Sequence, residues 1–222
     1  MIIRNINGAV ITHSDERTLR RAAEQCVAQK LDLSGADFRG EKLVKASLDG
    51  ARAKGACFWG ADLTGSDLGI ADLRGADMRR ASLKECCLAE SDLSGADLRG
   101  AYFSNTLLDG AILDGARISC PSVWSCDLQT VSSMCGLVYS HKGEVDIVLN
   151  RPPLVLRGLP QRLVLLPGFC LWGSRIYTAD DMPADLRRAM KSANAAMTNM
   201  LRRPMRDAKR PIPKISGAEA SF

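Results

Sequence analysis

The sequence predicts a mainly β fold in which the chain winds as a polygonal coil. The first observation behind this prediction is a five-residue repeat that runs from residue 31 to about residue 130. The second is that all twenty positions found at every fifth residue from 33 to 128 are apolar. The third is that aromatic residues make up only 5% of the 222 residues, which suits a core built from small repeated units.

A period of five fits neither the 3.6-residue period of an α-helix nor the two-residue alternation of a β-strand. Glycine often stands two positions after the central apolar residue, as in the segment 71–75, which reads Ala-Asp-Leu-Arg-Gly. Glycine adopts the backbone angles that a corner requires. We therefore predict one corner of the coil per repeat. The central residue and the small residue two positions before it point inward, and the other three point to solvent.

The repeat resembles that of the pentapeptide-repeat family, whose unit reads Ala-(Asp/Asn)-Leu-x-x. Clear copies are found at 36–40, 61–65, 71–75 and 96–100. The resemblance implies a right-handed, four-sided β-helix with four pentapeptides per coil, and hence about five coils over residues 31–130. Residues twenty apart fit this fold, because one column reads Leu48, Leu68, Leu88, Leu108 and Leu128. At a strand spacing of about 4.8 Å, the column would be roughly 24 Å tall.

The first thirty residues predict a cap for the first coil. Residues 1–14 read as a hairpin with Asn7-Gly8 at its turn. Ser14 and Asp15 offer an N-cap, and residues 16–30 have helical spacing of apolar side chains. An exposed solenoid end needs such a cover. This opening, followed by the repeats, also looks like that of pentapeptide proteins from phages and prophages.

The five-residue frame is lost after Thr130. Residues 131–180 predict a β module of four or five short strands, because apolar runs between 137 and 177 are separated by turn residues. Residues 181–201 predict an amphipathic helix with an apolar stripe. Residues 202–222 form a basic tail that is either mobile or ordered by a partner. The stripe of the predicted helix consists of Leu186, Met190, Ala193, Met197 and Leu201.

The sequence offers no catalytic constellation, so we expect a protein that is not an enzyme and that uses no cofactor or metal. Ser140 and His141 are neighbours on a predicted strand, where successive side chains point to opposite faces. Phosphate-loop and dinucleotide-binding motifs are absent. None of the eight cysteines forms a Cys-x-x-Cys pair, which leaves little support for a zinc site.

The cysteines and the apolar content indicate where the protein resides. Apolar residues make up 46% of the chain, without a run of eighteen that could cross a membrane, and the N-terminus does not read as a secretory signal. We therefore expect a cytoplasmic protein with reduced thiols. Cys86 and Cys126 lie on an inner column, two coils apart, and are expected to be core residues. Cys57 and Cys87 take outward positions and are expected to be exposed thiols that could cross-link to a partner.

The outward positions suggest a surface for binding another protein. One outer track reads Arg39, Trp59, Arg79 and Arg99. It is either an ordinary solvated surface or a docking face, since interfaces favour aromatic and Arg anchors. The predicted C-terminal helix either packs on the core or presents its methionines to a partner. The basic tail could hold phosphates or an acidic protein surface, but its lack of aromatics makes nucleic acid a weak candidate. The candidate protein-binding residues are Arg39, Trp59, Arg79, Arg99, Met190, Met197, Arg202, Arg203 and Arg206.

Two functions from different classes follow. The best-known activity of the family that the repeat resembles is DNA mimicry, in which an acidic column occupies the DNA site of a type II topoisomerase. Residues 31–130 hold 15 acidic and 11 basic residues, whereas roughly 24 Å of duplex carries about 14 negative charges. The column is thus weakly acidic for a DNA mimic. We favour a non-enzymatic scaffold that binds a virion component or a host protein, within the host cell or a phage particle, with homo-oligomers as a further expectation.

Overall fold

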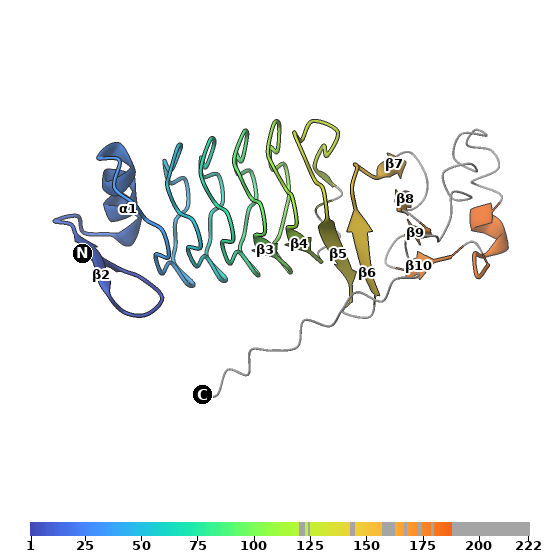
Figure 1. Cartoon of the computed structure of the whole chain (residues 1–222), viewed down its shortest axis with the longest axis horizontal. Coiled ribbons are helices and arrows are strands. Elements are labelled where there is room, and N and C mark those ends of the chain that lie inside the picture. Colours follow the sequence, from blue (N-terminus) through green and yellow to red (C-terminus); the bar gives the residue numbers. More distant parts are fainter. Residues whose placement is uncertain are drawn as a thin grey trace.

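The computed structural model describes residues 1–119, 123, 125–142, 145–156, 163–166, 168–172, 175–178 and 180–187. The chain forms a long column of stacked turns (Figure 1). A hairpin and a helix lie at the N-terminal end of the column, and two antiparallel β elements follow at the other end.

The N-terminal hairpin consists of β1 (Ile2–Arg4) and β2 (Val10–His13), which pair antiparallel. Its turn is held by the side chain of Asn5, whose Oδ1 accepts hydrogen bonds from the backbone N–H groups of Asn7 and Ala9 at 3.0 and 2.9 Å. Gly8 in the turn has a φ of 83°, a conformation that glycine adopts without strain. The hairpin therefore forms at the Asn-Gly turn expected from the sequence.

The helix α1 (Leu19–Ala28) begins later than expected, because Thr18 is its N-cap. The Thr18 hydroxyl accepts a hydrogen bond from the backbone N–H of Arg21 at 3.2 Å. The expectation that Ser14 and Asp15 cap the helix was wrong. Ser14 belongs to the end of the hairpin, where its N–H donates to the Met1 carbonyl and its hydroxyl bonds to the side chain of Gln25.

One side of α1 faces the first turns of the column. Ala22, Ala23 and Cys26 on this side are buried. The side chains of the helix also bond to column backbone: Arg20 donates to the Lys45 carbonyl at 3.4 Å, and Glu24 accepts from the Ser47 N–H at 3.2 Å. The helix thus covers the apolar end that a solenoid would otherwise expose.

In the column, four series of parallel bridges join residues that are twenty positions apart. One series runs through Asp37, Cys57 and Asp77 and continues through the short strands β3 (Asp97–Leu98) and β4 (Arg117–Ile118). All but the last of the parallel bridges span twenty residues, which is the length of four five-residue repeats. Most corners are glycines with φ between 64° and 72°, and the backbone of each turn is hydrogen-bonded to the next.

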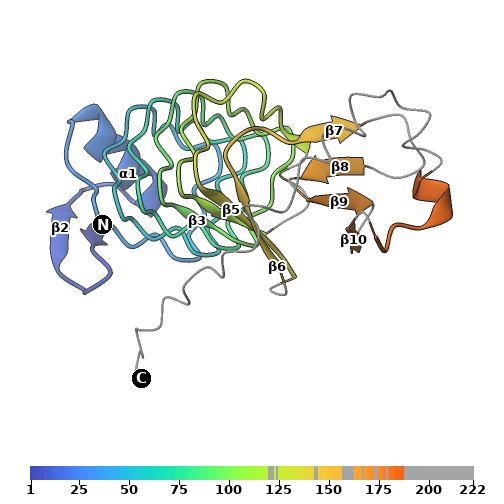
Figure 2. The ribbon, with the colours of Figure 1, turned by 45° about the vertical axis from the view of Figure 1, so that its right-hand side comes forward.

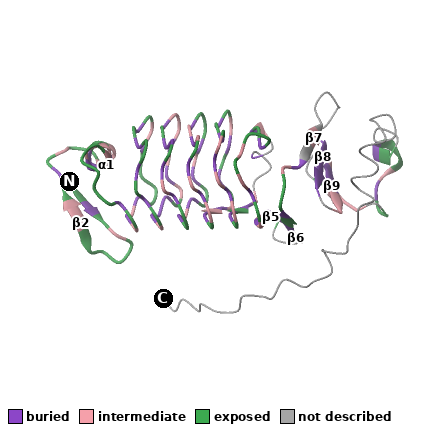
Figure 3. Ribbon diagram, turned by 45° about the horizontal axis from the view of Figure 1, so that its top comes forward, coloured by how far each residue is buried: buried purple, intermediate pink, exposed green. Residues whose placement is uncertain are grey.

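The core of the column is lined by the central residues of the repeats. All twenty, from Leu33 to Leu128, are buried (Figure 3). The rings of Phe38 and Phe58 stack with centroids 5.2 Å apart. Where a repeat has a hydroxyl in place of the small apolar residue, that hydroxyl donates to a backbone carbonyl, as Ser66 does to Leu43 at 2.6 Å. Buried polar groups in the column are therefore satisfied where they occur.

The stack continues beyond Thr130, the residue at which the sequence frame ends. Ile112 pairs with Ser133, and β4 pairs parallel with β5 (Leu137–His141), at an offset of twenty-one residues instead of twenty. Met134 and Tyr139 extend the buried inner columns. One inserted residue shifts the five-residue pattern in the sequence but leaves the parallel pairing intact.

The C-terminal part contains six strands in the described residues, where four or five were expected. β6 (Val145–Leu149) pairs antiparallel with β5. A second antiparallel sheet, in the order β10-β9-β8-β7, follows it (Figure 2). Its strands are β7 (Leu154–Leu156), β8 (Leu163–Leu166), β9 (Phe169–Trp172) and β10 (Arg175–Tyr177).

The two central strands of the second sheet, β8 and β9, have buried side chains on both faces. Val164, Leu166 and Leu171 join the core of the column, so this face closes its C-terminal end. Leu163, Leu165 and Cys170 pack instead with Met182 and with Leu186, which lies on a helical turn at residues 184–187. The rest of the expected 181–201 helix and the basic tail lie outside the described residues. None of the helices in the part that is described has the length and apolar content needed to cross a bilayer.

Candidate protein-binding surface

Four outward side chains follow the bridge series that starts at Asp37. Arg39, Trp59, Arg79 and Arg99 each stand two residues after a bridged residue, so their side chains leave the same side of the column. We call this set the Arg/Trp row. Trp59 is 40% exposed, and the three arginines are also accessible to solvent. The sequence-predicted track is therefore brought together as a continuous outer row.

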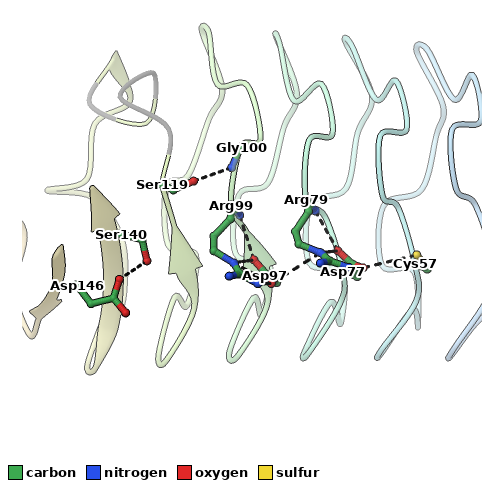
Figure 4. Close-up of polar contacts among 9 residues, drawn as sticks. All are labelled: Cys57, Asp77, Arg79, Asp97, Arg99, Gly100, Ser119, Ser140 and Asp146. Atoms are coloured by element: carbon green, nitrogen blue, oxygen red, sulfur yellow. Dashed lines mark hydrogen bonds and ion pairs between the residues drawn. The ribbon is translucent and has the colours of Figure 1, made fainter. Parts of the chain in front are cut away.

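Each arginine of the row is clamped by the aspartate two residues before it. Figure 4 shows the clamps of Arg79 and Arg99. In the Arg79 clamp, Nε donates to Asp77 Oδ1 at 2.8 Å and Nη2 donates to Oδ2 at 2.7 Å. Arg39 and Arg99 make the same bidentate contact, with Asp37 and Asp97. Bidentate geometry fixes the guanidinium plane. The row thus presents arginines whose guanidinium planes are held in a fixed orientation.

The clamps also set the charge state of the carboxylates. The hydrogen bonds from Arg79 hold the pKa of Asp77 below its ordinary value. Burial alone would raise the pKa of Asp97, but the hydrogen bonds from Arg99 outweigh burial and hold that pKa below its ordinary value too. The acidic members of this surface therefore stay ionised at neutral pH, and each is neutralised by its own arginine.

Trp59 interrupts the series of clamps. In its repeat Cys57 stands where the others have aspartate, so Trp59 lies between the clamped arginines of the turns on either side. The guanidinium carbon of Arg80 lies 5.9 Å from the ring centroid, within cation–π range. Arg80 occupies a corner at which other turns have Gly40, Gly60 and Gly100. This departure from the glycine pattern could have identified Arg80 as a surface residue beside Trp59.

Cys57 is not the exposed thiol that was expected, because only 7% of the residue is accessible. Its short side chain lies between the Asp37 and Asp77 clamps, with Sγ 3.9 Å from Asp77 Oδ2. Burial raises the pKa of the Cys57 thiol. Cys87 is half-buried, and Cys135 is the exposed cysteine among those described, all of which are free thiols.

Two polar contacts lie at the far end of the row. Ser119 accepts a hydrogen bond from the Gly100 N–H at 2.9 Å, and Ser140 donates to Asp146 Oδ1 at 2.5 Å (Figure 4). The ring of His141 instead lies against Tyr139, with Nδ1 3.3 Å from the phenol oxygen. Within the described residues, no three His, Cys, Asp or Glu side chains are placed to hold a metal ion.

The other predicted site residues cannot be placed on this surface. Met190, Met197, Arg202, Arg203 and Arg206 lie outside the described residues.

The stacked turns, which are built from five-residue repeats and joined by the bridge series, define a β-solenoid. The family model for pentapeptide repeats matches eight copies in the chain, over residues 32–69, 71–100 and 86–119. A pentapeptide repeat protein from Nostoc PCC 7120 is 31% identical, over 47% of this chain and 83% of its own length, with a TM-score of 0.40. This chain belongs to the pentapeptide-repeat family, and its solenoid is a right-handed β-helix.

Other similarities cover less of the relatives. A pentapeptide repeat protein from the Arabidopsis thaliana thylakoid lumen is 39% identical over 37% of this chain and 64% of its own length, with a TM-score of 0.29. QnrB1, a plasmid-mediated fluoroquinolone resistance protein, is 19% identical over 47% of this chain and half of its own length, with a TM-score of 0.29. No curated protein matches the sequence.

Proposed function

We propose that the protein is a non-enzymatic scaffold that binds a protein partner through the Arg/Trp row. The observation that carries the proposal is the exposed Trp59 between arginines that their own aspartates hold in place. Tryptophan and arginine are the residues most enriched among binding hot spots. A clamped arginine has already lost much of its rotamer freedom, so binding to it costs less side-chain entropy.

The proposal includes the architecture that presents the row. Bridges at intervals of twenty residues support a four-sided column of about five coils over residues 31–130. The cap of residues 1–30 and the β module of residues 131–180 flank it, followed by the 181–201 helix and the 202–222 tail. Arg202, Arg203 and Arg206 remain candidate contacts, as do Met190 and Met197.

Affinity capture with the full chain as bait, in the host that produces it, tests the scaffold. Trp59→Ala should abolish retention of the partner, and with the purified partner it should weaken binding by about 2 kcal/mol or more. Tyr102→Ala is the matched control, because Tyr102 is an exposed aromatic on a different bridge series.

A second pair of variants tests whether binding requires an arginine of the Arg/Trp row or any arginine that an aspartate clamps. Arg79→Ala should weaken binding, whereas Arg74→Ala should not, although Arg74 makes the same bidentate contact with Asp72 on another series. Equal retention by wild type, Trp59→Ala and Arg79→Ala would refute the row as the binding surface.

The alternative function is inhibition or protection of a type II topoisomerase by DNA mimicry. The regular spacing of Asp72 and Asp92, and of Asp77 and Asp97, on neighbouring turns supports it. The ion pairs weigh against it, because all four of these aspartates are paired with Arg74, Arg79 or Arg99. DNA mimicry predicts inhibition of supercoiling that disappears when all four aspartates are changed to asparagine. The scaffold predicts no effect on supercoiling.

The cellular setting is a further part of the proposal. The N-terminal hairpin and helix, which look like the opening of phage and prophage members of the family, support a virion component or a host protein as the partner. Detection of the chain in purified phage particles would support the first. Its presence only in the host cytoplasm would favour the second.

A further inference from the structure

Exposed and half-buried apolar side chains lie on the side of the column formed by the bridge series that begins at Ser47. Leu107, which is 54% exposed, is the bridged neighbour of the half-buried Cys87. Ile70, which is 64% exposed, donates its N–H to the carbonyl of the half-buried Ala89 at 2.8 Å. We call these four residues the apolar patch.

The repeats on this side of the column contain acidic residues but no basic ones. The repeats at 46–50, 66–70, 86–90, 106–110 and 126–130 contain no lysine or arginine in 25 residues. We call their outer surface the acidic face. None of its acids takes part in an ion pair within the described residues, in contrast to the clamped aspartates of the Arg/Trp row. The acids of this face are Asp49, Asp67, Glu90, Asp109 and Asp127, and all are exposed.

Ile70 is held in an unfavourable backbone conformation at the edge of the patch. Its φ of 53° lies in the left-handed region, which penalises β-branched residues most. The other described residues with positive φ are glycines or unbranched side chains of Lys, Arg, Glu and Asn. A large apolar side chain is thus kept in solvent at a corner where glycine would be less strained, which points to a contact that the rest of the column does not provide.

The chain itself contains a segment of complementary chemistry. Residues 202–214 read RRPMRDAKRPIPK, with six basic residues, one acid, and the apolar residues Met205 and Ile212 between the charges. Fourteen residues separate this segment from Arg187, and they span roughly 21 Å as part of the helix expected over 181–201. The thirteen residues of the segment itself add roughly 43 Å when extended, so together they exceed the column height of roughly 24 Å.

We propose that residues 202–214 dock on the acidic face of the same molecule, with their basic side chains on the carboxylates and their apolar residues on the patch. The face is acidic and the segment is basic, so their attraction should weaken as ionic strength rises. The inference goes beyond the proposed scaffold function, because it concerns a different bridge series. Either can fail without the other, since the Arg/Trp row is tested by loss of a partner and the acidic face by contacts within one chain.

Zero-length cross-linking of the full chain tests the docking. A water-soluble carbodiimide joins a lysine amine to a carboxylate as an amide and takes up the water that is lost, and peptide mass spectrometry locates the bond. We expect links from Lys209 and Lys214 to Glu90, Asp109 and Asp127, with yields that fall severalfold in 1 M NaCl. Links spread over the exposed carboxylates of all bridge series would overturn the proposal.

Variants and isotope mixing sharpen the test. Glu90→Gln with Asp109→Asn and Asp127→Asn should remove these links. The matched triple variant Asp32→Asn, Asp62→Asn, Asp114→Asn, on other series, should leave them unchanged. In an equal mixture of ¹⁴N and ¹⁵N protein the links should join peptides of the same label. A statistical proportion of mixed-label links would show docking on a second copy and would contradict binding within one molecule.

Discussion

Two leucine-to-alanine substitutions on the same bridge series should differ widely in their effect on the free energy of unfolding. Leu68 is a central, fully buried residue, whereas Leu107 is an outward residue that is 54% exposed. Leu68→Ala removes apolar carbons worth roughly 2 kcal/mol in transfer free energy. The cavity left behind adds to this cost, because buried Leu→Ala substitutions span about 2–5 kcal/mol according to how far the site collapses.

Collapse around Leu68 is restricted by the backbone of the stack. The N–H of Leu48 donates to the Asp67 carbonyl, and the N–H of Leu68 donates to the Cys87 carbonyl, both at 2.8 Å. These bonds fix the spacing of the turns above and below, so we expect Leu68→Ala to cost about 3–4 kcal/mol. Leu107→Ala should cost less than about 1 kcal/mol.

Urea unfolding followed by circular dichroism measures both variants. The difference in midpoint multiplied by the slope gives the change in free energy when the slope is unchanged. A changed slope would indicate loss of cooperativity between turns, which solenoids permit. Equal destabilisation by the two substitutions, or a larger loss for Leu107→Ala, would refute the assignment of inward and outward positions.

Three further predictions concern corners, thiols and acid. Gly75→Val should lower the free energy of unfolding by about 1–2 kcal/mol in the same urea assay. A Cβ at this position would meet no atom within 4 Å, so the loss comes from the φ of 65° alone. Gly75→Asn should cost less, and the reverse order would contradict this explanation. At pH 8, iodoacetamide should modify Cys135 faster than Cys86 and Cys126, whose burial raises the pKa of these thiols to about 12 and about 11; equal rates by peptide mapping would be the contrary result. Because the folded-state pKa values of Asp37, Asp72 and Asp77 are lowered, the stability that they contribute is fully present above the ordinary carboxyl pKa near 4 and is lost as pH falls through the lowered values. In Arg79→Ala, the free energy of unfolding should therefore fall less between pH 4 and pH 2 than in the wild type. An unchanged pH dependence would count against the Asp77 clamp.

The repeat pattern predicted the core well because every turn of the solenoid repeats the same local environment. The frame from Leu33 to Leu128 and the outward row with Trp59 follow from it directly. The continuation past Thr130 could not be read in the same way. A single inserted residue destroys the period in the sequence, whereas backbone pairing between Ile112 and Ser133 tolerates it.

Local chemistry also misled the sequence analysis where tertiary contacts compete. Ser14 is a good N-cap residue, but the hairpin uses its backbone and its hydroxyl, so Thr18 caps the helix instead. Cys57 occupies an outward position of the repeat, yet the long clamped side chains beside it reduce its exposure to 7%. Such effects depend on the lengths of neighbouring side chains twenty residues away, which a five-residue pattern does not include.

The alignment of residues twenty apart is tested most directly by a cross-link to the native Cys87. Asp67 is the bridged neighbour of Cys87, and adjacent strands lie about 4.8 Å apart, within the range that a disulfide requires. Mild oxidation of Asp67→Cys should give a 67–87 disulfide in peptide maps, and Asp72→Cys, one repeat further on, should not bond to Cys87. A 72–87 bond in place of the 67–87 bond would contradict the twenty-residue turn.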